Sequence, residues 1–335
     1  MALNRRTAGR SLQWIVMGAA VASNASYSQP PAHPNVVQES RQQAGGEFVQ
    51  MTNGLLRLIP CNSNIIHVSF APGHDIPDLS NPAISDAACP PIPFRVEDSP
   101  TEVALVTPEL RVAVNRNSGA VHFTESGNHT LLAEADWPFP RRVAATVTSG
   151  YAAHEAATWF ALTAEEHLYG LGQHQTGVLD NRNLEFSLAE DNTNISIPFF
   201  LSSEGYGLLW NSASVTNWNN RFRQVLAIRS NNADAVDYYF IAGPSFDRIV
   251  AGYRHLTGAA PLFPKWAYGY WQSKLAYNSS EQLAAVADRY RATHIPLDSL
   301  VLDAGWETVF GSRVFTKEYP DPSAMVQHLP PALSP

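Results

Sequence analysis

The sequence predicts an antiparallel β-sandwich over residues 46–250, followed by a βαβ unit within residues 251–335. Two observations support this fold class. From Glu47 onward, apolar and polar residues alternate in short runs separated by Asn-Gly, Ser-Gly and Pro-Gly pairs, which are turn signals. After the sandwich the spacing changes to that of a helix, and a strand, a second helix and a further strand then follow in about 40 residues.

The alternating region is typical of two packed sheets that each turn one face to a common core. It includes NGLLRLIPCNSNIIHVSFAPG, ELRVAVNRNSGAVHFTESG, ISIPFFLSSEGYGLLW and VDYYFIAG. Within it, RNSGAVHF predicts a hairpin turn between two strands. The 335 residues, of which 45% are hydrophobic, can bury a sizeable core and favour about two domains.

The region after the sandwich carries the signals of two helices and two strands. PSFDRIVAGYRHLTG has the spacing of a helix that ends at Gly258. WAYGYW predicts a short aromatic strand, and NSSEQLAAVADRYRATH predicts a helix whose capping box pairs Ser279 with Gln282. LDSLVL is apolar on both faces, as expected for a strand that is covered on both sides of a parallel sheet, and this strand is predicted to end at Asp303.

Residues 1–28 have the three parts of a secretory signal peptide: MALNRRTAGR is positively charged, LQWIVMGAAVA is apolar, and SNASYSQ offers small residues for cleavage. The apolar run is too short to span a bilayer, so we expect no membrane span. This interpretation predicts a secreted or periplasmic protein; the alternative is a frayed N-terminus or a misassigned start. Residues 29–45 are polar and Pro-rich, which predicts a flexible leader.

Charge and cysteine content exclude several classes of function. The net charge is −8 without a basic block, and an acidic chain repels phosphate backbones, so nucleic acid is not an expected partner. Cys61 and Cys89 are the only cysteines; after export they could form a disulfide or remain two buried thiols, and the sequence leaves both open. Two cysteines indicate neither redox catalysis nor a zinc site, and we expect no metal and no cofactor.

Five motifs, in order and correctly spaced over residues 169–326, resemble glycoside hydrolase family 31, the family of α-glucosidases and α-xylosidases. They are YGLGQHQTG (169–177), NTNISIPFFLSSEGYGLLWNS (192–212), FPKWAYGYWQSK (263–274), IPLDSLVLDAGWE (295–307) and YPDPSAMV (319–326). The resemblance implies a galactose-mutarotase-like sandwich ahead of a (β/α)8 TIM barrel. It also implies retaining hydrolysis of terminal α-linked glucose or xylose, with an α-linked oligosaccharide or glycoside as substrate.

The resemblance covers only the start of the barrel. From Leu262 to Pro335 the sequence is far shorter than the roughly 250 residues of such a barrel, and PPALSP would forbid a central strand. A retaining enzyme needs two carboxylates about 5–5.5 Å apart, whereas Glu307, Glu318 and Asp321 match neither catalytic position of the family. We therefore expect a truncated family member without catalytic residues, which a C-terminal barrel fragment from another polypeptide could complete.

Asp303 and Asp191 are the acidic candidates for substrate binding. Asp303 matches the family's substrate-binding aspartate, and a carboxylate at the C-terminal end of a barrel strand can accept two hydrogen bonds from sugar hydroxyls. The alternative for Asp303 is an acidic cap on the following turn. Asp191, in AEDNTN, matches a loop that reaches over the pocket in relatives; the alternative is a surface Asx-turn.

Three further residues are candidates for the lining of the pocket. Trp271 and Trp306 could stack on sugar faces, although an aromatic residue near a strand end is as often a packing residue. Lys274, together with Gln272, could supply polar lining.

Two other polar pairs are not interpreted as catalytic. Gln173 and His174 lie on a Gly-rich turn, and we expect both to be structural. Glu165 and Glu166 are adjacent, and adjacent residues of a strand point to opposite faces, so they could not act as a catalytic pair.

Two classes of function therefore remain open. The chain is either part of a secreted α-glycosidase, inactive by itself, or a non-catalytic sandwich that binds carbohydrate or another partner. The sugar stays open between glucose and xylose. Small residues at Ala304 and Gly305 leave room for the hydroxymethyl group of glucose, whereas the GLGQHQ turn is more similar to the xylosidase branch.

Overall fold

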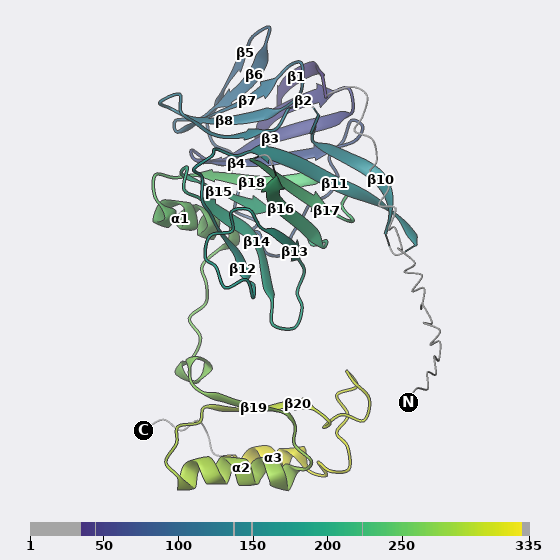
Figure 1. Ribbon diagram of the computed structural model, residues 1–335, viewed down its shortest axis with the longest axis vertical. Coiled ribbons are helices and arrows are strands. Elements are labelled where there is room, and N and C mark those ends of the chain that lie inside the picture. Colours follow the sequence, from purple (N-terminus) through teal and green to yellow (C-terminus); the bar gives the residue numbers. More distant parts are fainter. Residues whose placement is uncertain (1–34, 44, 137, 149, 223, 330–335) are drawn as a thin grey trace, which may run out of the picture. The chain divides into compact units, whose positions relative to one another are not determined.

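The computed structural model describes residues 35–329 except positions 44, 137, 149 and 223 (Figure 1). The chain divides into two compact units between Gly258 and Ala259. The predicted signal peptide at residues 1–28 and the final PPALSP lie outside the described residues.

The first unit consists of two antiparallel sheets, which confirms the predicted sandwich. Its eight-stranded sheet has the order β1 (Val37–Gln43), β2 (Gly46–Met51), β3 (Gly54–Asn62), β4 (Ile65–Ala71), β18 (Val236–Ala242), β15 (Tyr206–Trp210), β14 (Ile195–Ser202) and β12 (Leu168–Gln173). The second sheet has the order β13 (Glu185–Leu188), β16 (Thr216–Phe222), β17 (Val225–Ser230), β11 (Tyr151–Ala161), β9 (Thr130–Glu134), β8 (Val121–Glu125), β7 (Leu110–Asn115), β6 (Glu102–Val106) and β5 (Arg95–Asp98), with β10 (Arg142–Thr148) paired to β11. The hairpin predicted at RNSGAVHF joins β7 and β8, whose residues pair from Leu110 with Glu125 to Val114 with Val121.

Residues 37–43 differ from the expectation of a flexible leader, because they form the edge strand β1. This strand pairs antiparallel with β2. Only Val37 is buried, and its amide donates a hydrogen bond of 2.9 Å to the carbonyl of Arg116. Strand β1 is held by backbone pairing rather than by side-chain burial. Its polar sequence VQESRQQ therefore lacks the apolar alternation that indicates a strand.

A buried ion pair connects the two sheets of the sandwich. The side chains of Glu134, at the end of β9, and Arg141, ahead of β10, form an ion pair and are 2% and 1% exposed. Glu134 also accepts a hydrogen bond of 2.9 Å from the hydroxyl of Tyr238 on β18, in the opposite sheet. The Arg141 guanidinium lies 4.9 Å from the ring centroid of Phe70 on β4. Burial, reinforced by the charge of Glu134, raises the pKa of Tyr238 well above its usual value, so its hydroxyl remains a donor.

Helix α1 (Phe246–Thr257) packs on the outer face of the eight-stranded sheet, as Figure 1 shows. Its N-cap is Ser245, whose side chain accepts a hydrogen bond from the amide of Arg248, and its C-cap is Gly258 with φ 82°. Glycine suits this left-handed conformation, which a side chain would strain. The predicted helix and its stop at Gly258 are thereby confirmed.

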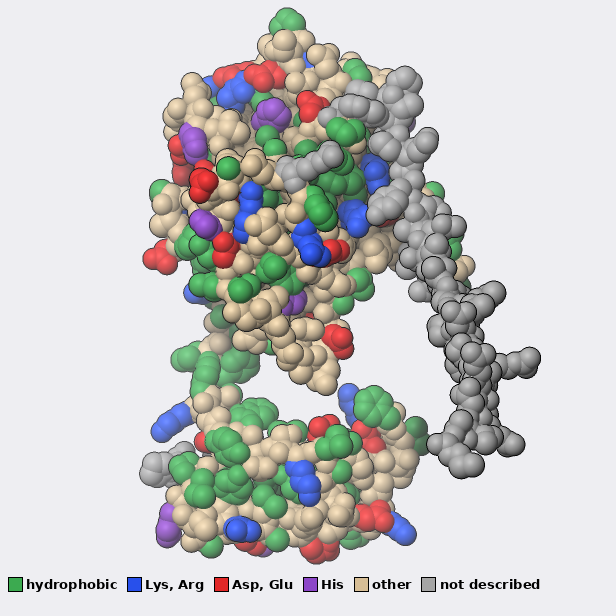
Figure 2. Space-filling view, viewed as in Figure 1, with side chains coloured by type: hydrophobic (Ala, Val, Ile, Leu, Met, Phe, Trp, Pro, Cys, Tyr) green, Lys and Arg blue, Asp and Glu red, His purple; other side chains and the backbone are tan. Residues whose placement is uncertain are grey.

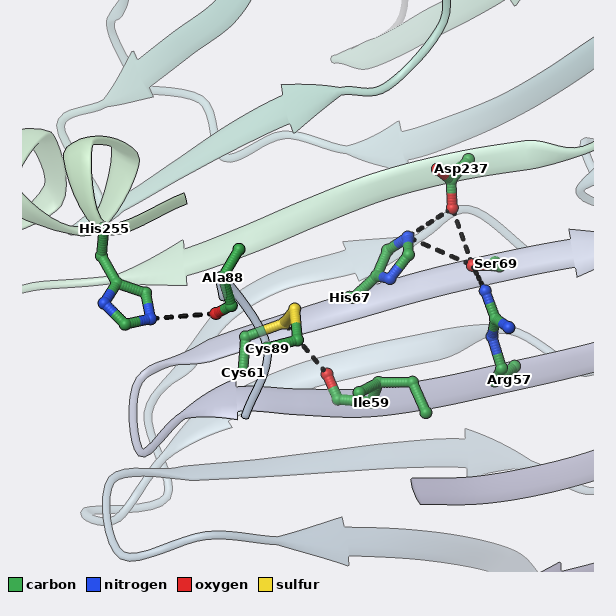
Figure 3. The surroundings of a disulfide bond; sticks show 9 residues. All are labelled: Arg57, Ile59, Cys61, His67, Ser69, Ala88, Cys89, Asp237 and His255. Atoms are coloured by element: carbon green, nitrogen blue, oxygen red, sulfur yellow. Dashed lines mark hydrogen bonds and ion pairs between the residues drawn. A yellow bond between two sulfur atoms is a disulfide. The ribbon is translucent and has the colours of Figure 1, made fainter. Parts of the chain in front are cut away.

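A disulfide joins Cys61 on β3 to Cys89 in the loop between β4 and β5 (Figure 3). The structure thus decides between the two states that the sequence left open. The two cysteines are 28 residues apart, and closing a loop of this length stabilises a fold by about 3–4 kcal/mol, mainly by restricting the unfolded chain. The bond fixes the long loop 72–94 to the outer face of the sheet.

The second unit has the order η1 (Lys265–Tyr268), β19 (Trp271–Ala276), α2 (Ser280–Ala292), β20 (Ser299–Ala304) and α3 (Pro322–His328). Strands β19 and β20 are parallel and flank α2 in sequence, which makes the predicted βαβ unit. Helix α2 begins with the predicted cap: Ser279 accepts a hydrogen bond from the Gln282 amide at 3.3 Å. The Gln282 side chain accepts one in return from the Asn278 amide at 2.6 Å.

The strand predicted at WAYGYW is wrong. Residues 265–268 form the 3-10 helix η1 after Pro264, and β19 begins only at Trp271. The aromatic residues Trp266, Tyr268 and Tyr270 occur at every second position and imitate a strand. Backbone hydrogen bonds from residue 267 to 264 and from 269 to 266 close a turn there instead.

Glu47 is a buried carboxyl on the core side of β2. It shares this face with Val49 and Met51, it is 1% exposed, and its Oε2 has no hydrogen-bond partner among the described residues. Burial, together with the charge of Asp98, raises the pKa of Glu47 from its ordinary value of 4.5 to about 7. A raised pKa for an acid means that the folded state favours the protonated form.

This pKa predicts a pH dependence of stability. Below about pH 4.5 Glu47 is protonated in both the folded and the unfolded state, so it does not lower the free energy of unfolding. This free energy should fall as the pH rises from about 4.5 to about 7, and above that it should stay lower by about 3 kcal/mol. Glu47→Gln should remove this fall, so the variant gains on the native chain as the pH rises through this range. Urea unfolding at pH values below and above the range measures it, with the exposed Glu39→Gln on β1 as control. Parallel pH profiles of Glu47→Gln and the native chain would contradict the prediction.

Candidate functional site

Asp303 lies one residue before the C-terminal end of β20 and is exposed. Leu300 and Leu302, at alternate positions, pack on the small core formed with α2 and α3. Asp303 therefore points to the opposite face of the sheet, because side chains alternate along a strand. In a (β/α)8 barrel this helix-free face is the interior, and the C-terminal strand ends carry the active site.

Trp306 stands beside Asp303 but is held by packing. Its Nε1 donates a hydrogen bond of 3.1 Å to the carbonyl of Asp303, and its ring lies 4.9 Å from that of Phe315 between centroids. The ring is half-buried against the small core of Tyr277, Leu283, Tyr319 and Met325. Trp306 thus fixes the turn after β20.

Trp271 is placed at the other end of the strand pair. It is the first residue of β19 and pairs with Ser299, the first residue of β20. Ser299 lies four positions before Asp303, which is about 13 Å along the strand. Trp271 is 45% exposed and contacts Trp266, with ring centroids 5.8 Å apart. This geometry favours a packing role over contact with a sugar held by Asp303.

Lys274 and Gln272 lie on the helix-covered face. Lys274 pairs with Leu302, whose side chain packs toward the helices, and its Nζ lies 5.7 Å from the ring centroid of Tyr277. Gln272 Oε1 accepts a hydrogen bond of 2.5 Å from the hydroxyl of Tyr290 on α2. The structure does not bring either side chain to the face of Asp303, so it argues against both as pocket lining.

Leu275 is a residue of this face that the sequence analysis missed. The register pairs Lys274 with Leu302 and Ala276 with Ala304, which places Leu275 level with Asp303 on the same face. It is 75% exposed. The alternation of WQSKLA would have indicated Leu275 if β19 had been placed at its true position, which begins at Trp271, directly after the 3-10 turn η1.

Asp191 belongs to the sandwich unit and caps its own turn. Its carboxylate accepts a hydrogen bond of 2.7 Å from the amide of Asn192, and its backbone bridges to Asn194. Between them Thr193 adopts φ 74°, a left-handed conformation that is unusual for a β-branched residue. The exposed carboxylate fits the local-turn alternative, and its contact with substrate stays a prediction.

The other carboxylates near β20 have local partners. Glu307 accepts a hydrogen bond of 2.9 Å from the amide of Arg313, and Asp321 caps α3 by accepting one of 2.9 Å from Ala324. Glu318 lies 3.8 Å from Lys317 in an exposed ion pair. None of them stands at a strand end beside Asp303.

The pair Glu165 and Glu166 lies in the turn before β12 rather than on a strand. Glu165 is exposed, whereas Glu166 is buried and accepts hydrogen bonds from Ser202 at 2.6 Å and Tyr206 at 2.5 Å. Burial, followed by the charge of Glu166, raises the pKa of Tyr206 well above its usual value. Strand alternation therefore does not apply to this pair, but one carboxylate lies in solvent and the other is hydrogen-bonded in the core.

Of the two residues on the Gly-rich turn, His174 has structural contacts, whereas the structural role of the exposed Gln173 stays a prediction. His174 Nε2 is 2.8 Å from the carbonyl of Leu171, and its ring packs on Phe186 with centroids 4.7 Å apart.

Metal and membrane features are absent from the described part of the chain. Within it, no three His, Cys, Asp or Glu side chains are grouped so as to hold a metal ion. None of the helices in residues 35–329 has both the length and the apolar character needed to cross a bilayer.

Family comparisons agree with this architecture. Residues 55–219 match the glycosyl hydrolase 31 N-terminal galactose mutarotase-like domain. Residues 260–332 match the glycosyl hydrolases family 31 TIM-barrel domain. The two matched segments correspond to the sandwich and to the βαβ unit that carries Asp303. The chain therefore belongs to glycoside hydrolase family 31.

Individual relatives are similar over part of their length. An alpha-xylosidase of Saccharolobus solfataricus is 41% identical over 182 residues, which are 51% of this chain and 25% of the relative. A family 31 glucosidase of Pseudescherichia vulneris, described as uncharacterized, is 34% identical over 174 residues, or 49% of this chain and 31% of the relative. The alignments thus span about a quarter to a third of these relatives.

Solved structures share the fold. A family 31 alpha-xylosidase from a soil metagenome, complexed with xylose, has a TM-score of 0.75 and 25% identity, and the match covers 87% of this chain and 45% of that one. A dextranase of Flavobacterium johnsoniae complexed with isomaltotriose also has a TM-score of 0.75, with 21% identity, 89% coverage of this chain and 37% of that one.

The second unit exposes many apolar side chains, as Figure 2 shows for one face. They are Leu262, Phe263, Trp266, Tyr268, Tyr270, Trp271, Leu275, Ile295, Val309, Phe310, Val314 and Val326. Its buried core of four residues is small by comparison. A unit with so little burial opens easily.

We therefore expect limited trypsin digestion to cut first in the second unit, after Arg313 and Lys317, and to leave the sandwich intact. Lys317 is 92% exposed at its side chain and Arg313 has φ 54° in an exposed turn. Mass spectrometry of the digest over time identifies the resistant fragment. Survival of the whole chain under conditions that digest a denatured control would contradict this expectation.

Proposed function

We propose that this chain is the N-terminal portion of a secreted, retaining α-glycosidase that removes terminal α-linked glucose or xylose. The observation that carries the proposal is Asp303, a carboxylate at the C-terminal end of a parallel strand, on the helix-free face of a unit that matches the family's barrel domain. Membership of family 31 supports glycoside hydrolysis as the class of reaction.

Asp303 would act in substrate binding rather than in bond cleavage. An ionised carboxylate only accepts hydrogen bonds, and it can accept two from neighbouring hydroxyls of one sugar. The hydrogen bond from Trp306 to the Asp303 carbonyl fixes the backbone beneath this side chain. Leu275, level with it on β19, would offer an apolar neighbour to the sugar ring.

The chain by itself would be inactive. Retaining hydrolysis needs a nucleophile and an acid/base carboxylate about 5–5.5 Å apart. Among the described residues, Glu307, Glu318 and Asp321 contact local partners, and none of the three matches a catalytic position of the family. The two carboxylates would come from barrel strands beyond those described, either in a longer form of this chain or in a complementing C-terminal fragment.

The disulfide supports an oxidising compartment. Cys61–Cys89 would not persist in a reducing cytosol, and the predicted signal peptide at residues 1–28 would direct the chain out of it. Secretion or export to the periplasm is therefore part of the proposal. The names of the relatives support both sugars, since an alpha-xylosidase and a glucosidase are both similar to this chain.

The first test is activity of the 335-residue chain on aryl α-glucosides and α-xylosides. We expect no release of aryl alcohol above the uncatalysed background, because loss of either catalytic carboxylate alone costs orders of magnitude. A full-length homologue serves as positive control. Turnover that disappears in Asp303→Ala would show that the chain holds catalytic groups beyond those proposed.

The second test restores a complete barrel by fusing residues 1–304 to the remaining barrel of a relative. In this hybrid, Asp303→Asn should lower kcat/KM about 10- to 100-fold, since a charged hydrogen bond to substrate is worth about 1.5–3 kcal/mol. A matched control is Asp288→Asn on the exposed side of α2. A hybrid that is equally active with and without the Asp303 carboxylate would refute the assignment.

A further inference from the structure

A cavity of about 750 Å³ opens on the outer face of the eight-stranded sheet. Its wall is the segment 79–86 of the loop between β4 and β5, and β18 contributes Tyr239 to it. The lining residues are Leu79, Ser80, Asn81, Pro82, Ile84, Ser85, Asp86 and Tyr239. The volume falls in the range of about 300–1,000 Å³ that is usual for small-molecule sites. The proposed hydrolysis assigns no role to this cavity.

Tyr239 is the feature of this cavity that points to a ligand. The residue is 5% exposed, and its hydroxyl is not one of the fully buried atoms without a partner, so the hydroxyl keeps access to the opening. Among the described residues it forms no side-chain hydrogen bond, which leaves it able to donate to a molecule in the cavity. Burial and the nearby charge of Asp237 raise the pKa of Tyr239 above its usual value, so the hydroxyl stays protonated and can donate.

The position of the Tyr239 ring is fixed from below. It stacks on His67 with centroids 4.1 Å apart and an interplanar angle of 10°. His67 Nε2 lies 2.6 Å from Asp237 Oδ1, and the same oxygen accepts a hydrogen bond of 2.7 Å from Ser69 (Figure 3). This buried network holds the imidazole, and through it the tyrosine, in one orientation.

The wall is tied to the same network. Asn81 Nδ2 donates to Asn211 Oδ1 at 2.6 Å, and Asn211 Nδ2 donates to Asp237 Oδ2 at 2.5 Å. On the other side, the amide of Ser85 donates to the carbonyl of Leu256 in α1 at 2.8 Å. The disulfide at Cys89 fixes the loop three residues beyond the last lining residue. A cavity held in this way binds without first ordering its wall, which favours affinity.

The lining selects the class of ligand. It contains no Lys, Arg or His, so nothing in it compensates the charge of an anion. Ser80, Ser85 and Tyr239 offer hydroxyls, and Asp86 offers an acceptor carboxylate. Two aliphatic residues and one proline supply apolar surface. Neutral ligands with many hydroxyls match this mixture of donors, acceptors and apolar contact.

We propose that this cavity is a carbohydrate-binding site of the sandwich, which takes a neutral glycosyl unit with Tyr239 as hydrogen-bond donor and Asp86 as acceptor. The site belongs to the sandwich unit alone. It therefore does not depend on Asp303 or on completion of the barrel, and it goes beyond the proposed hydrolysis.

The test is calorimetric titration of the full chain with glucose, xylose and isomaltotriose as probes. We expect at least one of them to bind with a Kd in the millimolar range, as for a site with few hydrogen bonds. Tyr239→Phe removes only the unpartnered hydroxyl, so the fold should be retained while affinity falls about five- to tenfold. Asp86→Asn is a second variant on the open wall and should also weaken binding.

One control variant and one diagnostic variant show whether the sugar is bound at this cavity. Tyr253→Phe makes the same change in α1, where the ring stacks on Phe199 with centroids 4.4 Å apart and does not line the cavity, so affinity should be unchanged. Loss of binding in Asp303→Asn, with Tyr239→Phe binding as the native chain does, would assign the sugar to the barrel unit and overturn this proposal without touching the proposed hydrolysis. Absence of binding for all three probes, or equal binding by Tyr239→Phe and the native chain, would overturn the proposal.

Discussion

The ion pair between Glu134 and Arg141 is the interaction on which the sandwich depends. Both side chains lie almost wholly out of water between the sheets, and an isolated charge there would be strongly unfavourable. Each therefore contacts both layers: Tyr238 donates to Glu134 from the opposite sheet, and Phe70 faces the guanidinium. Removing one partner of such a pair typically costs about 3–5 kcal/mol. This constraint fixes how β9 and β18 face each other.

The outer face of the eight-stranded sheet is organised by a different principle. There the loop 72–94 has little apolar pattern of its own, and the disulfide at Cys89 with the hydrogen bonds of Asn81 and Ser85 attach it to the sheet and to α1. Covalent and polar attachments of this kind hold a long loop in place without a large core. The cavity beside Tyr239 exists because these attachments hold the loop segment 79–86 over the sheet, where it lines an opening.

The two units differ in how completely their apolar side chains are buried. The sandwich buries its apolar side chains in a contiguous core, whereas the βαβ unit covers one face of a two-stranded parallel sheet and leaves the other in water. Parallel sheets are normally buried on both faces. Asp303 and Leu275 lie on that uncovered face, so the chemistry of this unit depends on further strands that would close a barrel around them.

The sequence by itself determined the antiparallel sandwich, the cap and stop of α1, the capping box of α2 and the family, because turn residues, caps and periodicity are local signals. It did not indicate β1, whose polar residues 37–43 are held by backbone pairing. It also misplaced β19, since alternating aromatics from Trp266 imitate a strand. Only the tertiary structure decided which of the candidate pocket residues share a face with Asp303. It also decided that Cys61 and Cys89 form a disulfide. It also revealed the cavity at Tyr239. Each of these depends on register and on contacts between distant residues, which no local pattern encodes.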